Sequence, residues 1–393
     1  MTLIIFTIAI AVISYAIIIV TYVSYFLLVL RNRKVPSYFK LIQQIEATPL
    51  KREDLPKVTI LVPAYNEEKV ISEKLQNLSE LDYPFDKVDV LIVDDCSTDR
   101  TCEIAKNMFS KLDMRGKIIK NPQRVGANAS CNIGVVNANS SLILRTDADT
   151  VIKADSLLKA VRIILNLDNV GGVTGAMVPV VTSATVATTM ENSYRTLFSK
   201  MSTAESALHS TYASGGGFAL IRKKAFSPIP VGFGSTDANI SLSFVRKGFR
   251  YLYVPDTYSF EAISKKLGEQ GRQKVRRASR LIQSTILNMD FFFNRKYGTF
   301  GMAVFPLRFM MFLVCPFLTA VAIFATFCCL FSLSEGLSVG ILVVAGIVLY
   351  LRKPLNSAKL NSIISLLFQQ FCLVAGLLFA SRKITVWQRV LSE

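Results

Sequence analysis

Pairs of carboxylates directly follow short apolar, β-branched runs at two places in the first half of the chain. The pairs are Asp94-Asp95 and Asp147-Ala148-Asp149. Carboxylates at positions i and i+2 after an apolar strand can share one hard divalent cation, whose remaining ligands are phosphate oxygens of a substrate. The first pair, which continues into Asp99, has an alternative interpretation as a helix cap. This chemistry predicts a site for a phosphate-bearing ligand.

Three strands and two helices are expected to position these side chains. The runs 58–62, 88–93 and 142–144 are rich in β-branched residues, and 67–80 and 98–112 have helical apolar spacing. Alternation of strand and helix predicts a parallel sheet covered by helices. Ligands bind such sheets at the carboxyl ends of the strands, where all three runs end in polar residues.

The composition predicts a membrane protein. The chain has 393 residues, of which 51% are hydrophobic and 19% charged, with a net charge of +17. An apolar and basic chain fits anionic lipid or phosphate ligands. A nucleic-acid partner is not expected, because only the charge would support it. The single histidine excludes a multi-histidine metal centre.

The apolar residues are concentrated at the two ends of the chain. Residues 1–30 are long enough for one transmembrane helix. Arg31, Arg33 and Lys34 follow, so the positive-inside rule places the next region in the cytoplasm of a multi-pass cell-membrane protein. The predicted division is a catalytic domain at 51–270, a basic, interfacial helical segment at 271–300 and a C-terminal transmembrane region at 301–393.

The C-terminal region holds three apolar segments, at about 303–331, 333–351 and 362–380. Pro306 and Pro316 interrupt the first, where Arg308 is expected to snorkel to the cytoplasmic edge. The third contains Gln369 and Gln370, so it can span, lie in the interface or line a polar path. The basic residues after 380 favour a cytoplasmic tail, whereas four spans would place the tail outside; the sequence leaves both open.

The central region resembles the inverting family 2 glycosyltransferases with the GT-A fold, a Rossmann-like α/β fold. The resemblance is to the membrane-attached branch that includes hyaluronan, chitin and cellulose synthases. Six motifs carry it in order: VPAYNEE at 62–68, DDCSTD at 94–99, RVGANASCN at 124–132, DAD at 147–149, SGGGFALIRKKA at 214–225 and TDANISLSFVRKGFR at 236–250.

The resemblance implies a nucleotide-sugar site. The donor would be a UDP- or GDP-sugar, and Asp95 would hydrogen-bond its base. Asp147 and Asp149 would hold Mg²⁺ or Mn²⁺ on the diphosphate, where the cation neutralises charge on the departing nucleoside diphosphate. The residues implied to contact the nucleotide are Pro63, Ala64, Tyr65, Glu67, Asp95 and Asp147.

The resemblance also implies that Asp237 is the general base. The family usually has two acids here, and this chain has Thr236-Asp237, so only the second acid is kept. The alternative role for Asp237 is a helix N-cap, and both roles can hold together. The glycines Gly215, Gly216 and Gly217 would allow close approach of the acceptor, with a flexible loop as the alternative.

A basic segment after the catalytic region is implied to bind the diphosphate. Its residues Gln273, Arg276, Arg277 and Arg280 fall on one helical face. Related synthases have Gln-x-x-Arg-Trp, with the tryptophan under the acceptor sugar. Arg277 replaces that tryptophan here, which removes the stacking role needed for polysaccharide-style processivity. The alternative is a juxtamembrane basic helix on anionic lipid.

The expected function is metal-dependent, inverting transfer of a sugar to a glycan or a lipid-linked acceptor at the cytoplasmic membrane face. A polyprenyl or dolichyl phosphate acceptor is the alternative within this class. A catalytically inactive nucleotide-sugar-binding membrane protein is the alternative from another class. The intact Asp147, Asp149 and Asp237 favour the enzyme.

Overall fold

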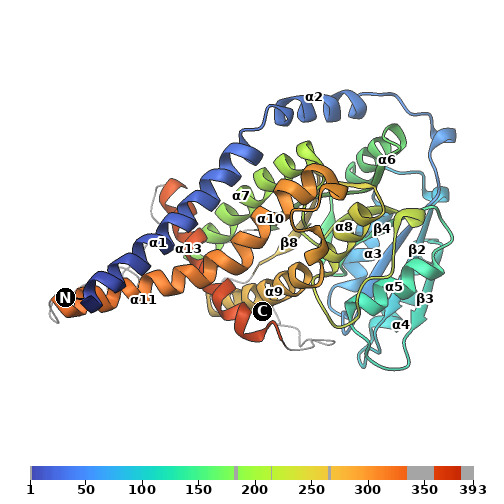
Figure 1. The fold of residues 1–393 in the computed structure, drawn as a ribbon. Coiled ribbons are helices and arrows are strands. Elements are labelled where there is room, and N and C mark those ends of the chain that lie inside the picture. The colour runs from blue at the N-terminus through green and yellow to red at the C-terminus, as the bar shows by residue number, and fades with distance from the viewer. Residues whose placement is uncertain (1, 181–184, 214, 264–266, 334–357, 382–393) are drawn as a thin grey trace.

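The computed structural model describes residues 2–180, 185–213, 215–263, 267–333 and 358–381. An α/β domain occupies one end of the molecule, and long apolar helices extend from it (Figure 1). The predicted apolar segment at 333–351, apart from its first residue, and the basic tail after residue 381 lie outside the described residues.

One mixed sheet of eight strands forms the centre of the domain. Its strand order is β3-β2-β1-β4-β7-β6-β8-β5. The strands are β1 (Val58–Ala64), β2 (Val88–Asp94), β3 (Gly116–Lys120), β4 (Leu142–Arg145), β5 (Thr150–Ile152), β6 (Val170–Val180), β7 (Ala219–Arg222) and β8 (Arg250–Ala262).

The three predicted strands are confirmed, and they run parallel. β1 lies between β2 and β4, with Ala64 opposite Asp94 and Leu61 opposite Arg145. Both faces of β1 are buried: Ile60 belongs to the core on one face and Leu61 to the core on the other. A strand buried on both faces needs an unbroken apolar run, which is the pattern seen in the sequence.

Helices cover both faces of the sheet. Buried side chains of α3 (Ile71–Ser79), α4 (Thr101–Lys111) and α6 (Ser156–Asn166) belong to one core. Buried side chains of α5 (Ala127–Asn137) and α8 (Thr236–Arg246) belong to the core on the opposite face. The predicted helices at 67–80 and 98–112 correspond to α3 and α4, which are shorter at their N-terminal ends because polar turns precede them.

Two further helices connect the domain to the apolar helices. They are α7 (Val186–Leu208), which packs beside β6 and β8, and α9 (Leu267–Leu287). A separate helix, α2 (Lys34–Glu46), follows the N-terminal helix and packs on α6 and α7. Figure 1 shows α7 and α9 between the sheet and the apolar helices, so they link the two parts.

Within the described residues, two helical stretches are long and apolar enough to cross a membrane. The first, Ile4–Leu30, comprises most of α1 (Thr2–Tyr25) and a π-helical turn at Phe26–Leu30. The second, Phe300–Ser332, contains π-helical turns at Phe300–Val304 and Met310–Val314 around α10 (Phe305–Phe309), followed by α11 (Cys315–Leu333). Figure 1 shows α1 and α11 side by side. A shorter apolar stretch, Leu367–Phe379, ends α13 (Ala358–Phe379).

The expectation that Arg308 snorkels to a membrane edge is wrong. Its side chain is buried within the protein, and its Nε donates to Oε1 of Glu205 on α7 at 2.5 Å. A buried guanidinium requires a charged partner, and α7 supplies it. Pro306 and Pro316 do not break the stretch either: each lies two residues after a π-helical turn, Phe300–Val304 or Met310–Val314, and the helix continues through both.

Candidate functional site

The C-terminal ends of the parallel strands β1, β2 and β4 lie side by side, and all three predicted strand-end motifs meet there. The backbone N–H of Asp95 donates to the carbonyl of Ala64 at 2.8 Å. The N–H of Thr146 donates to the carbonyl of Leu61 at 3.0 Å. Asp147 and Asp149 lie in the turn between β4 and β5. The sheet therefore places the two acidic motifs beside the Pro63–Glu67 region.

Arg145 connects the two acids predicted to act in catalysis and metal binding. Its Nη2 is 2.6 Å from Oδ1 of Asp147, and its Nη1 is 3.3 Å from Oδ1 of Asp237. The guanidinium is 6% exposed, the Asp237 side chain 17% and the Asp147 side chain 33%. One buried cation thus holds two partly open carboxylates at the sheet edge.

Asp237 lies in the first turn of α8, and Ser235 is the N-cap residue of that helix. The alternative in which Asp237 caps the helix is therefore wrong. A carboxylate in the first turn is favoured by the helix dipole. This position, together with Arg145, directs Asp237 towards Asp147 instead of towards its own backbone.

The predicted acceptor glycines lie against the same two acids. The carbonyl of Gly216 accepts a hydrogen bond from Nη1 of Arg145. Gly216 has a φ of +100°, and a Cβ added there would lie 3.3 Å from Oδ2 of Asp237 and 3.5 Å from Oδ2 of Asp147. A Cβ on Gly217 would overlap Oγ of Ser259. The positive φ of Gly216 therefore favours glycine at a position where the backbone lies in close contact with both carboxylates.

The charges in this cluster shift one another's proton affinity. Burial raises the pKa of Asp147 to about 7; Arg145 counteracts this, and the nearby Asp149 and Asp237 add to it. Burial alone would lower the pKa of Arg145, but Asp147 and Asp237 raise it above its usual value. Crowded carboxylates that bind protons this readily are a suitable set of oxygen ligands for a divalent cation.

The protein itself supplies only part of a metal coordination shell here. Among the described residues there is no group of three or more histidine, cysteine or acidic side chains placed to hold a metal ion. Asp149 is exposed, and Asp147 keeps Oδ2 outside its ion pair with Arg145. Two hard oxygen donors at an open edge fit Mg²⁺ or Mn²⁺ whose other ligands come from phosphate and water.

Asp95 is bound by its own neighbouring loop. Its Oδ1 accepts from Nδ2 of Asn121 at 3.0 Å and from the N–H of Val125 at 2.8 Å, and its Oδ2 accepts from the N–H of Gly126 at 2.9 Å. In the same loop, the guanidinium of Arg124 stacks 3.5 Å above the ring of Tyr65. Asp95 therefore shapes the loop that faces Tyr65; its contact with a base stays a prediction.

The basic helix α9 presents its cations in two directions. Burial and the neighbouring Arg277 and Arg280 lower the pKa of Arg276 to about 10, while Glu261 and Asp149 oppose the shift. Burial lowers the pKa of Arg280, and Asp237 opposes that shift. Arg276 and Arg280 are thus within electrostatic reach of the site acids. Arg277 instead pairs with Oε1 of Glu261 at 2.9 Å.

Two functional candidates were missed by the sequence analysis, Arg145 and Lys74. Nζ of Lys74 donates to Oγ1 of Thr146 and to the carbonyl of Thr150, both at 2.8 Å, directly behind the Asp147–Asp149 turn. The sequence did contain a signal, because Lys74 falls on the apolar face of α3 with Ile71 and Leu75. For Arg145 the available signal was a cation inside an otherwise apolar strand.

Comparison with a solved structure identifies the class of fold. A mannosyltransferase from Pyrobaculum calidifontis, PcManGT, solved in complex with GDP-Man and Mn²⁺, is similar over 95% of this chain and 99% of its own, with 22% identity and a TM-score of 0.72. This likeness confirms the GT-A type of α/β fold with apolar helices at both ends.

Comparison with sequences finds a family that matches the central part of the chain. The family described as glycosyl transferase family 2 matches residues 59–229. A probable glycosyltransferase of Bacillus subtilis, YdaM, is 34% identical over 31% of this chain and 30% of its own length. An N-acetylglucosaminyltransferase of Rhizobium meliloti is 25% identical over 62% of this chain and 60% of its own. The chain thus spans less than two thirds of these curated relatives. Residues 59–229 therefore carry the likeness to the family 2 glycosyltransferases that the motifs predicted.

Proposed function

We propose that the chain transfers a sugar from a nucleotide diphosphate sugar to a hydroxyl of a glycan or lipid-linked acceptor, or to a lipid phosphate, with inversion at the anomeric carbon. The observation that carries this proposal is the pairing of Asp147 and Asp237 with one guanidinium, that of Arg145. Asp147 belongs to the predicted diphosphate site, and Asp237 is the predicted base.

In this mechanism Asp237 accepts the proton of the acceptor hydroxyl while the new glycosidic bond forms. Arg145 holds the carboxylate in place, and Gly216 leaves room for the acceptor beside it. Asp147 and Asp149 would hold a divalent cation, which when bound neutralises charge on the nucleoside diphosphate. Arg276 and Arg280 add positive charge on the same side.

The nucleotide would lie along the Pro63–Glu67 segment, with the loop of Arg124 beside it. Relatives named as N-acetylglucosaminyltransferases and a mannosyltransferase solved with GDP-Man support both a UDP- and a GDP-sugar as donor. The two long apolar helices and the cations Arg31, Arg33 and Lys34 support a cell-membrane location with the catalytic domain in the cytoplasm.

The test measures release of nucleoside diphosphate from a panel of UDP- and GDP-sugars by the purified full-length chain, with and without membrane lipid extract. Activity with one donor is expected in Mg²⁺ or Mn²⁺ and not in chelator. Asp149→Ala should abolish it, whereas Asp168→Asn, an exposed carboxylate at the start of the turn before β6, should not. Full activity of Asp149→Ala in chelator would overturn metal dependence, and binding of a donor without any turnover would favour the inactive alternative.

A further inference from the structure

A mostly apolar pocket lies between the catalytic domain and the apolar helices. Its volume is about 100 Å³. It is enclosed by α1, α7, α9, α13 and the π-helical turn at Met310–Val314. Its walls are aromatic, aliphatic and thioether groups such as Phe198, Leu281, Phe312 and Leu373. Such a wall favours an apolar ligand.

Several polar side chains in the wall are already bonded to the protein, whereas Oε1 of Gln370 has no hydrogen-bond partner among the described residues. Nε2 of Gln370 donates to the Tyr22 hydroxyl at 2.7 Å, and Oγ of Ser365 donates to the carbonyl of Met190 at 3.0 Å. The Tyr212 hydroxyl is 2.6 Å from Oγ1 of Thr285. A sugar chain needs such groups as hydrogen-bond partners, so these internal bonds favour a hydrocarbon ligand over a glycan.

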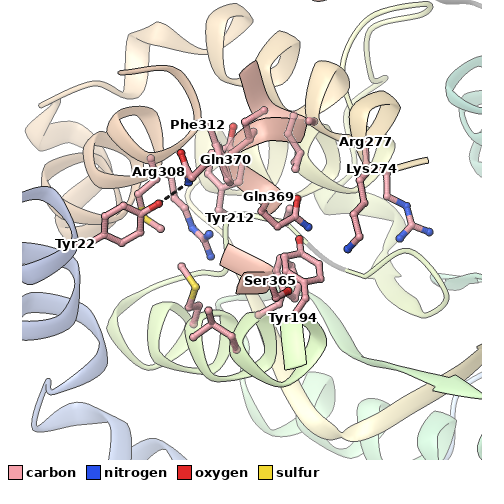
Figure 2. A pocket seen from close by; sticks show the side chains of 18 of the residues that line it. Tyr22, Tyr194, Tyr212, Lys274, Arg277, Arg308, Phe312, Ser365, Gln369 and Gln370 are labelled. Atoms are coloured by element: carbon pink, nitrogen blue, oxygen red, sulfur yellow. Dashed lines mark hydrogen bonds between the residues drawn. The ribbon is translucent and has the colours of Figure 1, made fainter. Parts of the chain in front are cut away.

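One side of the pocket is cationic. Figure 2 shows Lys274 and Arg277 together on that side, with Tyr22 and Arg308 on the opposite side, where the charge of Arg308 is paired with the buried Glu205. Nζ of Lys274 pairs with Oε2 of Glu191 and lies 4.4 Å from the ring centroid of Tyr194. The Arg277 side chain is 41% exposed, so it keeps donors available beyond its bond to Glu261.

Ion pairs link the side of the pocket that carries Lys274 and Arg277 to Asp147 and Asp237, the proposed acids of the site. Arg195 bonds Oε1 of Glu191 at 2.7 Å and Oε2 of Glu261 at 2.8 Å. A Cβ added to Gly215 would be 3.8 Å from Nη1 of Arg195, and the next residue, Gly216, lies against Asp147 and Asp237. The three cations Arg195, Lys274 and Arg277 exceed the two acids, 3 − 2 = +1, so an anion is accommodated here.

We infer that this pocket binds the apolar chain of a lipid acceptor and that its anionic head group lies at Lys274 and Arg277. The head group then faces the Gly215–Gly217 backbone and, beyond it, the acids of the site. This inference rests on the proposed function and narrows its acceptor to the lipid-linked class. A polyprenyl phosphate and a diacyl phospholipid both combine an apolar chain with an anionic head group. Only the polyprenyl phosphate would accept a sugar.

The probe is undecaprenyl phosphate, and its binding to the full chain in phosphatidylcholine nanodiscs is measured by native mass spectrometry. Leu281→Trp fills the pocket and should weaken binding about tenfold or more, the effect of losing roughly two buried methylene groups. Leu165→Trp, on α6 and 38% exposed, is the matched control and should bind the probe like the parent. Arg277→Gln leaves the apolar wall intact and should also weaken binding, so the test does not depend on one variant.

Nucleotide-sugar binding is measured in parallel and should be the same in the parent and Leu281→Trp. Undiminished binding of the probe by both Leu281→Trp and Arg277→Gln would overturn the inference. Equal competition by phosphatidylglycerol would show a bilayer lipid in the pocket and overturn the acceptor assignment, as would displacement of the probe by a soluble glycan. If the parent binds the probe in the pocket but no nucleotide sugar, the proposed function fails while the lipid site stands.

Discussion

Nη1 of Arg145 lies 3.3 Å from Oδ1 of Asp237, although the two residues are 92 positions apart in the chain. Arg145 is the last residue of β4, and Asp237 lies in the first turn of α8. The contact ties the family domain's central strand to the helix that carries the proposed base. Because Arg145 also holds Asp147, it sets the separation between Asp237, the proposed base, and Asp147, which belongs to the proposed diphosphate site.

Replacement of Arg145 by glutamine should reduce transfer by about 10²-fold, the effect of misplacing a reacting group by roughly 1 Å. It should also lower stability by up to about 3 kcal/mol, because two partly buried carboxylates lose their cation. Arg145→Lys should recover only part of the activity, since an ammonium cannot bridge both acids with a planar fork. Turnover and thermal unfolding of the purified variants check both effects.

The control for that prediction is Arg115→Gln. Arg115 forms an ion pair with Asp89 at 3.3 Å in which both side chains are substantially exposed. Its loss should change stability by less than about 1 kcal/mol and leave turnover unaltered. Equal behaviour of the two variants would mean that Arg145 does not position the acids.

Asp237→Asn should retain donor and metal binding, and if the acceptor group is a hydroxyl, transfer should fall by about 10²–10⁴-fold, the usual contribution of a general base. Asparagine keeps the size of the side chain but accepts no proton. Donor affinity by calorimetry and transfer rate are measured on the same preparation. A much smaller loss would indicate an acceptor that is already ionised, namely a lipid phosphate. Loss of donor binding would show that Asp237 is structural.

Lys74 makes stability depend on pH. Burial lowers its pKa from 10.5 to about 7, with Asp147 and Asp149 opposing the shift. Between these two values the unfolded chain binds more protons at this position than the folded chain, so the parent becomes more stable as pH rises. Below the folded pKa of about 7, the destabilisation caused by burying the charged Lys74 is present in full. It disappears as the pH rises towards 10.5.

Lys74→Met removes this contribution, so its stability relative to the parent should be most favourable near pH 7 and decline towards pH 10. Thermal unfolding in detergent with chelator, at several pH values, measures the difference. Lys69→Met, at an exposed position before α3, is the control. A difference between Lys74→Met and parent that is constant with pH would contradict the shift.

The proposed cytoplasmic position of the catalytic domain predicts that Val136→Cys is protected in intact cells. Val136 is 70% exposed on α5, and the four partly accessible cysteines, Cys96, Cys102, Cys328 and Cys329, are first replaced by serine. A membrane-impermeant maleimide should label the new cysteine only after the cells are permeabilised. Labelling of intact cells would reverse the orientation inferred from Arg31, Arg33 and Lys34.

The parallel half of the sheet was predictable from the sequence because it is buried on both faces. Ile60 and Leu61 are neighbours that enter different cores, and this produces a continuous apolar run. The other half was not predictable. β7 lies between β4 and β6 and runs antiparallel to both, and the long strand β8 pairs with β6 across a bulge at Gly175/Ala176. Such pairings depend on contacts far apart in the chain.

The candidate site divides in the same way. The position of Asp147 and Asp149 after β4 could be predicted because a strand end is a local feature. The salt bridge from Arg145 to Asp237 could not, since it depends on how α8 is placed over the sheet. The direction of Arg277 was also unpredictable: a helical face is defined by spacing, but Glu261 of β8 decides where this guanidinium points.

The packing of α13 on α9 leaves no side chain between the two helices at Gly376. A Cβ added there would lie 2.9 Å from both Cβ of Ala278 and the backbone N of Ser279. Nε2 of Gln283 also donates to the carbonyl of Ala380 at 3.0 Å. Displacing one helix along the other would break these contacts, so α13 and α9 form one packed unit. Because Arg276 and Arg280 are on α9, a displacement of α13 that carried α9 with it would change the electrostatic potential at Asp147 and Asp237.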